Sequence, residues 1–408
     1  MIFNSRRRFL TTSAKLTAAA LLSGCQPAAV HAQQKPLGQL IPTDSFAGIN
    51  SSTDAQFVTT PPEIVPSLPI PDPALAAKVG QMIMVGFAGQ YLDVNSAIVE
   101  EIAKGVVGNV VLFGRNIGSP AQVLAMTEAL QSVAQHPVLI GIDQEGGWVS
   151  RLPSSFGLSS NFSAQYLGEH NDLTLTAAQG NSTAAELYQL GINLNLAPVV
   201  DVNTNPDNPV IGRYERSYSA DPAIVAAHAQ AVIAAHRSHN VLCTLKHFPG
   251  HGSSQGDTHA GFVDVTDRWS VLELAPYATL IGAQSCDVVM TAHIFNATLD
   301  ADYPSTLSHK VVTGLLREQL GYNGVVISDD MQMGAISKQY ELETALGLAI
   351  NAGVDIIAFS NNIPLSRGAG GQQLHEMIIH LVETGVIPQS RIDESYNRII
   401  KLKQKLLT

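Results

Sequence analysis

Eight short apolar runs recur along this chain, and they constrain its fold more than any other feature. In chain order they read VGQMIMVGF, VGNVVLF, HPVLIGID, INLNLAPVVDV, HNVLCTLKH, CDVVMTAHI, NGVVISDD and VDIIAF. Unbroken runs of this kind are typical of strands buried on both faces, as in a parallel sheet. The seven intervals each contain a candidate helix, for example over 121–134, 177–190, 223–236 and 309–320. The pattern predicts a single α/β domain, a (β/α)8 barrel of the TIM type.

Composition narrows the class of partner. Of the 408 residues 45% are hydrophobic and only 14% are charged, which indicates a large buried core rather than a disordered scaffold. The formal net charge is −11, which disfavours nucleic acid or an anionic membrane surface as the main partner. Small neutral molecules fit this balance better.

The first residues resemble a bacterial export leader. SRRRFL at 5–10 matches the twin-arginine pattern, and the apolar run 16–22 that follows is too short for a permanent membrane span. Leu22-Ser23-Gly24-Cys25 then resembles a lipoprotein cleavage box. We therefore expect a signal peptide over 1–24, a lipid anchor on Cys25, and a periplasmic or membrane-anchored protein. Cleavage after Ala32, giving a soluble secreted protein, is the alternative.

Residues 25–73 are rich in Pro, Ser and Thr without a helical or strand period, as in TTPPEIVPSLPIPDP, and predict an extended tether. The folded domain is expected over 74–408, as a monomer. Cys243 and Cys286 lie in or beside apolar runs, where buried free thiols are expected rather than a disulfide or a metal pair.

Polar residues follow the apolar runs in a regular way. A polar group stands at the carboxyl end of five runs: Asp143, Asp201, Lys246-His247, His293 and Asp329. Barrel enzymes carry their catalytic groups at this end of the strands, so these residues are expected around one mouth.

The run GVVISDDMQM ends in Asp329 and Asp330. A carboxylate at a strand end can serve as a nucleophile, a base or a metal ligand. The structural alternative is a solvated cap of the next helix, and Asp330 fits that alternative better. Asp329 completes the set of strand-end groups, so it is the candidate for chemistry.

The loop KHFPGHGSSQGDTH, residues 246–259, places Asp257 two residues before His259. A carboxylate that hydrogen-bonds one imidazole nitrogen leaves the other free for proton transfer, the outline of an acid/base pair. Lys246 and His247 carry donors suited to sugar hydroxyls or an amide carbonyl, although a structural ion pair would also explain Lys246. We expect His251 to pack the loop.

Two further segments add charged candidates. GIDQEGGWVSRL contains Asp143, which can accept hydrogen bonds from vicinal hydroxyls, and Arg151, which either holds an acidic group or pairs with Asp143 or Glu145. NPVIGRYERSYSADP contains Arg213 and Arg216, and from these residues alone a position at the mouth and one on the surface fit equally well.

Taken together these motifs resemble family 3 glycoside hydrolases, in the bacterial β-N-acetylglucosaminidase (β-N-acetylhexosaminidase) branch. LFGRN, GIDQEGG, ERSYSADP, KHFPGHGSSQGDTH and ISDDMQM occur in family order, with MTAHI and PSTLS between the last two. The resemblance extends from about residue 74 to the C-terminal RIDESYNRIIKLKQ, which is essentially the whole folded domain.

The resemblance implies a role for each candidate. Asp329 would be the nucleophile that forms a covalent glycosyl-enzyme, His259 the acid/base and Asp257 its orienting partner. The terminal N-acetylglucosamine would be bound by Asp143, Arg151, Arg216, Lys246 and His247. The implied activity is exo-acting hydrolysis of β-linked glycans with retention, needing no metal or other cofactor.

The chain departs from the family pattern in four respects. Trp148 stands where the family has an arginine after E-G-G, which removes a cation and offers a stacking surface. IGRYERSY is slightly longer than the usual run before Arg216, and AGFVDV replaces the usual leucine-proline ending after His259. Many single-domain relatives are cytoplasmic, whereas this chain carries an export leader.

Other activities fit some of the same residues. A phosphorylase or a β-glucosidase of the same family would use the same fold. A metal-dependent barrel hydrolase could draw ligands from His247, His251, His259, His293 and Asp329, although the H-x-H strand end typical of such sites is missing. A lipoprotein that binds glycans without cleaving them is the remaining alternative.

Overall fold

The computed structural model describes residues 73–157, 161–362 and 370–407. The expected leader 1–24, the expected lipidation site Cys25 and the expected tether up to residue 72 lie outside the described residues. Pro73, placed in the tether by the sequence, is the first residue of helix α1. Among the described helices, none has the length and apolarity needed to cross a bilayer.

The eight apolar runs form the strands of one parallel barrel, as the sequence predicted. The strands are β1 Ile83–Gly86, β2 Asn109–Leu112, β3 Leu139–Ile142, β4 Leu194–Asn195, β5 Leu242–Phe248, β6 Val288–Thr291, β7 Val325–Ile327 and β8 Ile357–Phe359. They pair in the order β7-β6-β5-β4-β3-β2-β1-β8. A parallel bridge between Ile327 and Ile356 joins the two edges, and the N–H of Ser328 donates to the carbonyl of Ile356 over 2.9 Å.

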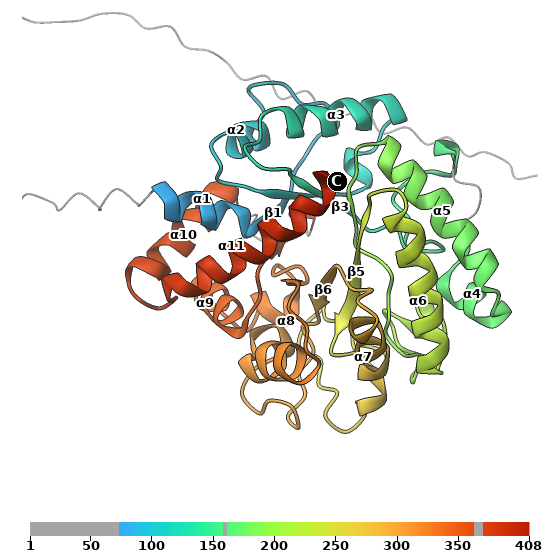
Figure 1. Ribbon diagram of the computed structural model, residues 1–408. Helices are drawn as coiled ribbons and strands as arrows, with labels where there is room; N and C mark the ends of the chain where they lie inside the picture. The colour runs from blue at the N-terminus through green and yellow to red at the C-terminus, as the bar shows by residue number, and fades with distance from the viewer. Residues whose placement is uncertain (1–72, 158–160, 363–369, 408) are drawn as a thin grey trace, which may run out of the picture. The chain divides into compact units, whose positions relative to one another are not determined.

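Helices surround the strands (Figure 1). Between strands lie α2 Ala97–Ala103, α3 Pro120–Ser132, α4 Ala164–His170, α5 Leu173–Gln189, α6 Pro222–Arg237, α7 Ala275–Gly282, a π-helix Lys310–Gln319, α8 Gly334–Ser337 and α9 Leu342–Ala352. Helix α1 Pro73–Gln81 precedes the barrel, and α10 Gly371–Glu383 and α11 Gln389–Gln404 follow it. Short 3-10 turns include η3 Gly212–Tyr214 and η4 Val271–Leu274.

Helix caps explain where the sequence placed boundaries slightly wrongly. Helix α5 begins at Leu173, not at 177, because the Asp172 side chain accepts hydrogen bonds from the N–H groups of Thr174 and Leu175. Helix α6 begins as expected, since Asp221 caps it and Pro222 occupies the first turn. The region 309–320 is helical as predicted, but in the π form.

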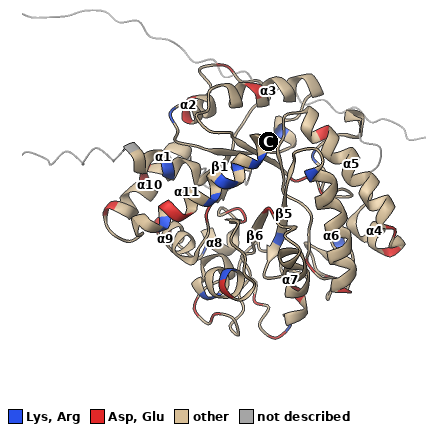
Figure 2. Cartoon of the chain, viewed as in Figure 1, with Lys and Arg blue, Asp and Glu red and all other residues tan. Residues whose placement is uncertain are grey.

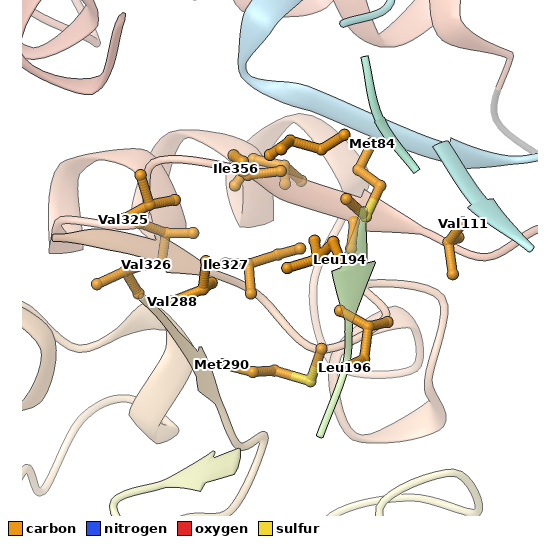
Figure 3. Close-up of a cluster of buried hydrophobic side chains, with 14 of the residues drawn as sticks. Met84, Val111, Leu194, Leu196, Val288, Met290, Val325, Val326, Ile327 and Ile356 are labelled. Atoms are coloured by element: carbon orange, nitrogen blue, oxygen red, sulfur yellow. The ribbon is translucent and has the colours of Figure 1, made fainter. Parts of the chain in front are cut away.

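The barrel interior is filled with apolar side chains from different strands. Figure 3 shows Met84 of β1, Leu194 of β4, Met290 of β6 and Ile327 of β7 directed toward one another. Such layers of branched and flexible side chains make the inside of a small barrel a packed core and not a pore. The polar residues at the carboxyl ends of the strands must therefore gather on the side of this layer that faces the predicted mouth.

At the amino ends of the strands, α11 fastens the barrel through buried charges. Figure 2 shows basic residues along α11. Arg391 and Arg398 bond the carboxylate of Asp355 at 2.8 and 3.3 Å, and Arg317 of the π-helix reaches the same carboxylate at 2.8 Å. Because Asp355 lies just before β8, this cluster stands at the end of the strands opposite the predicted mouth.

Candidate active site

The carboxyl ends of the strands surround a cavity of about 490 Å³. Its floor includes Met84, Leu196, Met290 and Ile327, part of the apolar layer of Figure 3. All eight residues chosen from the sequence line this one cavity: Asp143, Arg151, Arg216, Lys246, His247, Asp257, His259 and Asp329. The volume lies in the usual range for small-molecule sites.

Lys246 forms the centre of a buried charge cluster. Its ammonium lies 2.8 Å from Asp143 and 2.7 Å from Glu145, and its side chain is 2% exposed. Burial lowers the pKa of Lys246, but the carboxylates of Asp143 and Glu145 raise it more, so the net shift is upward. The ammonium therefore stays charged and fixed.

Glu145 joins Lys246 to Arg216. The guanidinium of Arg216 donates from Nε to Glu145 Oε2 and from Nη2 to Oε1, each over 2.8 Å. Burial raises the pKa of Glu145, but Arg216 and Lys246 lower it more, to about 2. Such two-pronged pairing orients the guanidinium as well as binding it. The longer segment before Arg216 does not keep it from the mouth.

The remaining cation at the mouth is Arg151. Its Nη2 lies 3.3 Å from Asp143 Oδ2, which decides between the two partners left open by the sequence. Burial raises the pKa of Asp143, and Lys246 and Arg151 lower it more, so the net shift is downward. Arg213 is exposed and does not line the cavity.

Lys246 and His247 both line the cavity although they are consecutive in β5, where side chains normally alternate. The register between β5 and β6 shifts between Leu245 and Phe248, and such an irregularity re-aims side chains. His247 Nδ1 lies 2.7 Å from Asp201 Oδ2, while Nε2 faces Arg216 at 3.4 Å. Asp201 thus fixes the imidazole plane.

Asp257 and His259 form the expected pair. His259 Nδ1 lies 2.8 Å from Asp257 Oδ1, and the His259 N–H donates to the same oxygen over 2.8 Å. The two side chains are 61% and 41% exposed, far more than the buried cluster beneath them. The pair is therefore open to an incoming substrate and to water. Asp257 contacts Nδ1 of His259, which leaves Nε2 for proton transfer.

Hydrogen bonds from side chains outside the loop hold the first half of the loop that carries the pair, residues 249–252. Trp269 Nε1 donates to the carbonyl of Pro249 over 3.2 Å, and Asn208 Nδ2 donates to that of His251 over 2.7 Å. Glu273 Oε2 accepts from the N–H of Gly252 over 2.8 Å. His251 is buried and its N–H donates to Asp201, which agrees with the packing role expected of it.

The second half of the loop is docked on α8. The N–H groups of Gly334 and Ala335 donate to the carbonyls of His259 and Thr258 over 3.1 and 3.0 Å. A Cβ at Gly334 would lie 2.8 Å from the His259 carbonyl oxygen, so this close approach needs glycine. Lys338 Nζ adds a bond of 2.8 Å to the carbonyl of Ala260.

Asp329 lies two residues after the end of β7 and lines the same cavity. Burial raises its pKa, but the neighbouring imidazoles, foremost His293 and His247, lower it more, so the net shift is downward. The N–H of Asp330 donates to Asp329 Oδ1 over 2.8 Å. Asp329 is therefore a half-buried carboxylate held in its ionised form.

Asp330 is not the solvated helix cap that the sequence favoured. Its carboxylate bonds the hydroxyl of Ser360 and accepts from the N–H groups of Ser360 and Gln332 over 3.2 and 3.1 Å. Burial raises the pKa of Asp330. The residue ties the end of β7 to the end of β8 and so fixes the backbone at Asp329, while α8 begins only at Gly334.

Three site residues were given no role from the sequence alone. Glu145 is the shared partner of Lys246 and Arg216, Asp201 holds His247, and Glu273 supports the loop. Asp201 carried a signal, since it follows an apolar run. Glu145 lies within GIDQEGG, but nothing in its spacing distinguishes it from a surface acid, and Glu273 lies outside every motif.

Among the described residues, no group of three or more His, Cys, Asp or Glu is placed to hold a metal ion.

The mouth of this parallel barrel gathers a half-buried ionised carboxylate, an imidazole–carboxylate pair and a cluster of paired charges, and barrel enzymes carry their catalytic groups at this end of the strands. The described thiols, Cys243 and Cys286, are both free and play no part in it. The chain belongs to glycoside hydrolase family 3, because the profile described as "Glycosyl hydrolase family 3 N terminal domain" matches residues 74–402.

Known relatives agree with this assignment. Beta-hexosaminidase A of Pseudoalteromonas piscicida is 37% identical over 75% of this chain and 55% of its own length. An uncharacterized secreted glycosyl hydrolase of Arthroderma benhamiae is 31% identical over 81% of this chain and 94% of its own. The structure of a family 3 beta-N-acetylglucosaminidase from a Paenibacillus strain superposes with a TM-score of 0.76 at 38% identity, covering 82% of this chain and 62% of that one. The chain thus spans little more than half the length of some of the relatives it matches.

Proposed function

We propose that the protein is an exo-acting, retaining β-N-acetylglucosaminidase that removes terminal β-linked N-acetylglucosamine from cell-wall or chitin-type glycans. The observation that carries the proposal is the meeting of Asp329, a half-buried carboxylate with a lowered pKa, and the His259–Asp257 pair at one cavity. The names of the relatives support the acetamido sugar as substrate.

In the first step the His259 imidazole donates a proton to the glycosidic oxygen. Asp329 attacks the anomeric carbon as the bond to the leaving oxygen breaks, and a glycosyl ester with an alcohol product results. The lowered pKa of Asp329 supports this role, because only the ionised carboxylate is a nucleophile. Asp257 orients the imidazole through Nδ1 and stabilises the charge that it carries before proton transfer.

In the second step His259, now neutral, takes a proton from water. The water oxygen attacks the same anomeric carbon, the ester bond breaks, and Asp329 is released as the carboxylate. Two inversions give retention. The 61% exposure of the His259 side chain supports the step, since water must reach the imidazole.

We assign binding of the terminal sugar to Asp143, Arg151, Arg216, Lys246 and His247. Their cations and carboxylates are paired and fixed before substrate arrives, so little ordering is needed on binding. The cavity lining holds both donors and acceptors, which suits vicinal hydroxyls and an acetamide carbonyl. Glu145 and Asp201 are positioning residues, because their contacts are to these side chains.

The test is turnover of aryl β-N-acetylglucosaminide and aryl β-glucoside by the purified protein, in phosphate-free buffer with chelator. We expect fast release from the acetamido sugar alone. Release from the glucoside would assign the β-glucosidase activity instead, and release from neither would refute the proposal. Repeating the reaction with phosphate and identifying the sugar product separates hydrolysis from phosphorolysis.

We further propose that residues 1–24 direct export by the twin-arginine route, that Cys25 is lipidated, and that 25–73 tether a monomeric barrel over 74–408. The leader motifs of the sequence and a relative named as secreted support this proposal. Membrane fractionation of the wild type and of C25A tests it. Release of the variant alone into the soluble periplasmic fraction is expected, and a wild type that is already soluble would favour cleavage after Ala32.

A further inference from the structure

Trp148 lines the catalytic cavity and yet exposes 69% of its surface. Single exposed apolar side chains are common on protein surfaces, but an aromatic ring at the mouth of a binding cavity offers a flat apolar face to the part of a ligand that extends out of the cavity. Of the side chains around this cavity, Trp148 offers the largest flat apolar face.

The backbone presents Trp148 rigidly. It follows Gly146 and Gly147, whose φ angles of +97° and +59° favour glycine. The N–H groups of Glu145 and Gly146 both donate to the carbonyl of Val149, over 3.0 and 3.2 Å, and close the turn. Because Glu145 is itself held by Lys246 and Arg216, the indole is mounted on the same framework as the sugar-binding cluster.

Tyr214 adds a second exposed aromatic ring to the same cavity. It lies in η3, two residues before Arg216, and exposes 48% of its surface. Trp148 follows β3 and Tyr214 follows β4, so the two rings come from neighbouring positions around the mouth. Both are far more exposed than Lys246 and Glu145, which places them outside the pocket for the terminal sugar.

The charges at the cavity disfavour an acidic occupant beyond that pocket. The Lys and Arg side chains that line it are Arg151, Arg216 and Lys246, and each is already paired with Asp143 or Glu145. Four carboxylates line the same cavity, those of Asp143, Asp257, Asp329 and Asp330. An acidic leaving group would therefore meet a net negative wall without a free cation among the described lining residues.

We propose that Trp148, assisted by Tyr214, forms the subsite for the leaving-group sugar, and that this sugar is a neutral N-acetylhexosamine. A pyranose ring has a flat face of C–H groups that packs on an aromatic ring, while its hydroxyls stay in water. The preferred substrates are thus short β-linked chains of N-acetylglucosamine rather than glycans whose next sugar carries a carboxylate. This inference rests on the proposed function.

The experiment compares kcat/KM for diacetylchitobiose with that for methyl β-N-acetylglucosaminide in the wild type, W148A and W148F. The methyl glycoside keeps the oxygen leaving group and the need for His259, but has no second sugar. We expect W148A to lower the ratio of the two values about tenfold, equivalent to about 1.4 kcal/mol, and W148F to lower it less. Y188A is the matched control, because Tyr188 is 60% exposed on α5 and does not line this cavity.

An unchanged ratio in W148A, or an equal loss on both substrates, would overturn the subsite. The neutrality of the leaving sugar is tested with a disaccharide of N-acetylglucosamine and N-acetylmuramic acid, which we expect the wild type to cleave more slowly than diacetylchitobiose. Faster cleavage of the acidic disaccharide would overturn that part. A wild type that cleaves none of the three substrates would refute the proposed function itself, so the two failures are distinguishable.

Discussion

Replacing Glu145 by glutamine should destabilise the barrel and weaken sugar binding together. Glu145 is the shared partner of Lys246 and Arg216, and its pKa of about 2 lies well below the ordinary value of 4.5. That shift corresponds to about 3 kcal/mol of stability at neutral pH. Glutamine cannot carry the charge, so E145Q should lose roughly this amount, and KM should rise because both cations lose their anchor.

The pH dependence gives this prediction its sign. The folded-state pKa of Glu145 is depressed, so its contribution is complete above the unfolded pKa of 4.5 and is lost as pH falls toward 2. The difference in unfolding free energy between wild type and E145Q should therefore be largest near neutral pH, about 3 kcal/mol, and fall to roughly 1.5 kcal/mol at pH 3.

Urea unfolding followed by tryptophan fluorescence at pH 7 and at lower pH values measures the difference. E100Q is the control, since Glu100 pairs with Lys104 on an exposed helix face and its loss should leave the unfolding midpoint almost unchanged. If E145Q unfolds at the same urea concentration as the wild type at pH 7, the electrostatic account of the cluster is wrong.

Three further predictions concern the supports of the site and its chemistry. D201N should raise KM with folding retained, because His247 loses the carboxylate 2.7 Å from Nδ1; steady-state kinetics with circular dichroism checks this. Burial raises the pKa of Glu273 from 4.5 to about 7, so the folded protein favours the neutral carboxyl. The free energy of unfolding should therefore fall as pH rises from 4.5 through 7, where the buried group must ionise. E273Q should flatten that fall in unfolding curves at pH 5 and pH 8. Prolonged dialysis against chelator should leave the turnover of aryl β-N-acetylglucosaminide unchanged.

The strands could be predicted because each is an unbroken apolar run that needs burial on both faces. That Asp143, Lys246, His247 and Asp329 line one cavity could be predicted, because barrel topology brings strand ends together whatever the loops do. The resemblance to a known family supplied the choice among them and the roles of Asp257 and His259.

Contacts between loops could not be predicted in the same way. Glu145 meets Lys246 and Arg216 only after the segments following β3, β4 and β5 have converged, and no local period encodes that convergence. Asp330 was expected to be a cap because its position before a helix is common for aspartate, but Ser360, just after the neighbouring strand β8, bonds it instead. The docking of the His259 loop on Gly334 likewise depends on a close backbone approach between distant segments.

The most direct test of the account is to trap the covalent intermediate on Asp329. In H259A, a dinitrophenyl β-N-acetylglucosaminide needs no acid for its leaving group, so Asp329 should still be glycosylated. The ester should then persist, because the base that activates water is gone. Peptide mass spectrometry should find one N-acetylhexosamine on the peptide that contains Asp329, and the D329A/H259A double variant should show none. An adduct on another residue, or none despite release of dinitrophenol in the first turnover, would contradict the assignment of Asp329 as the nucleophile.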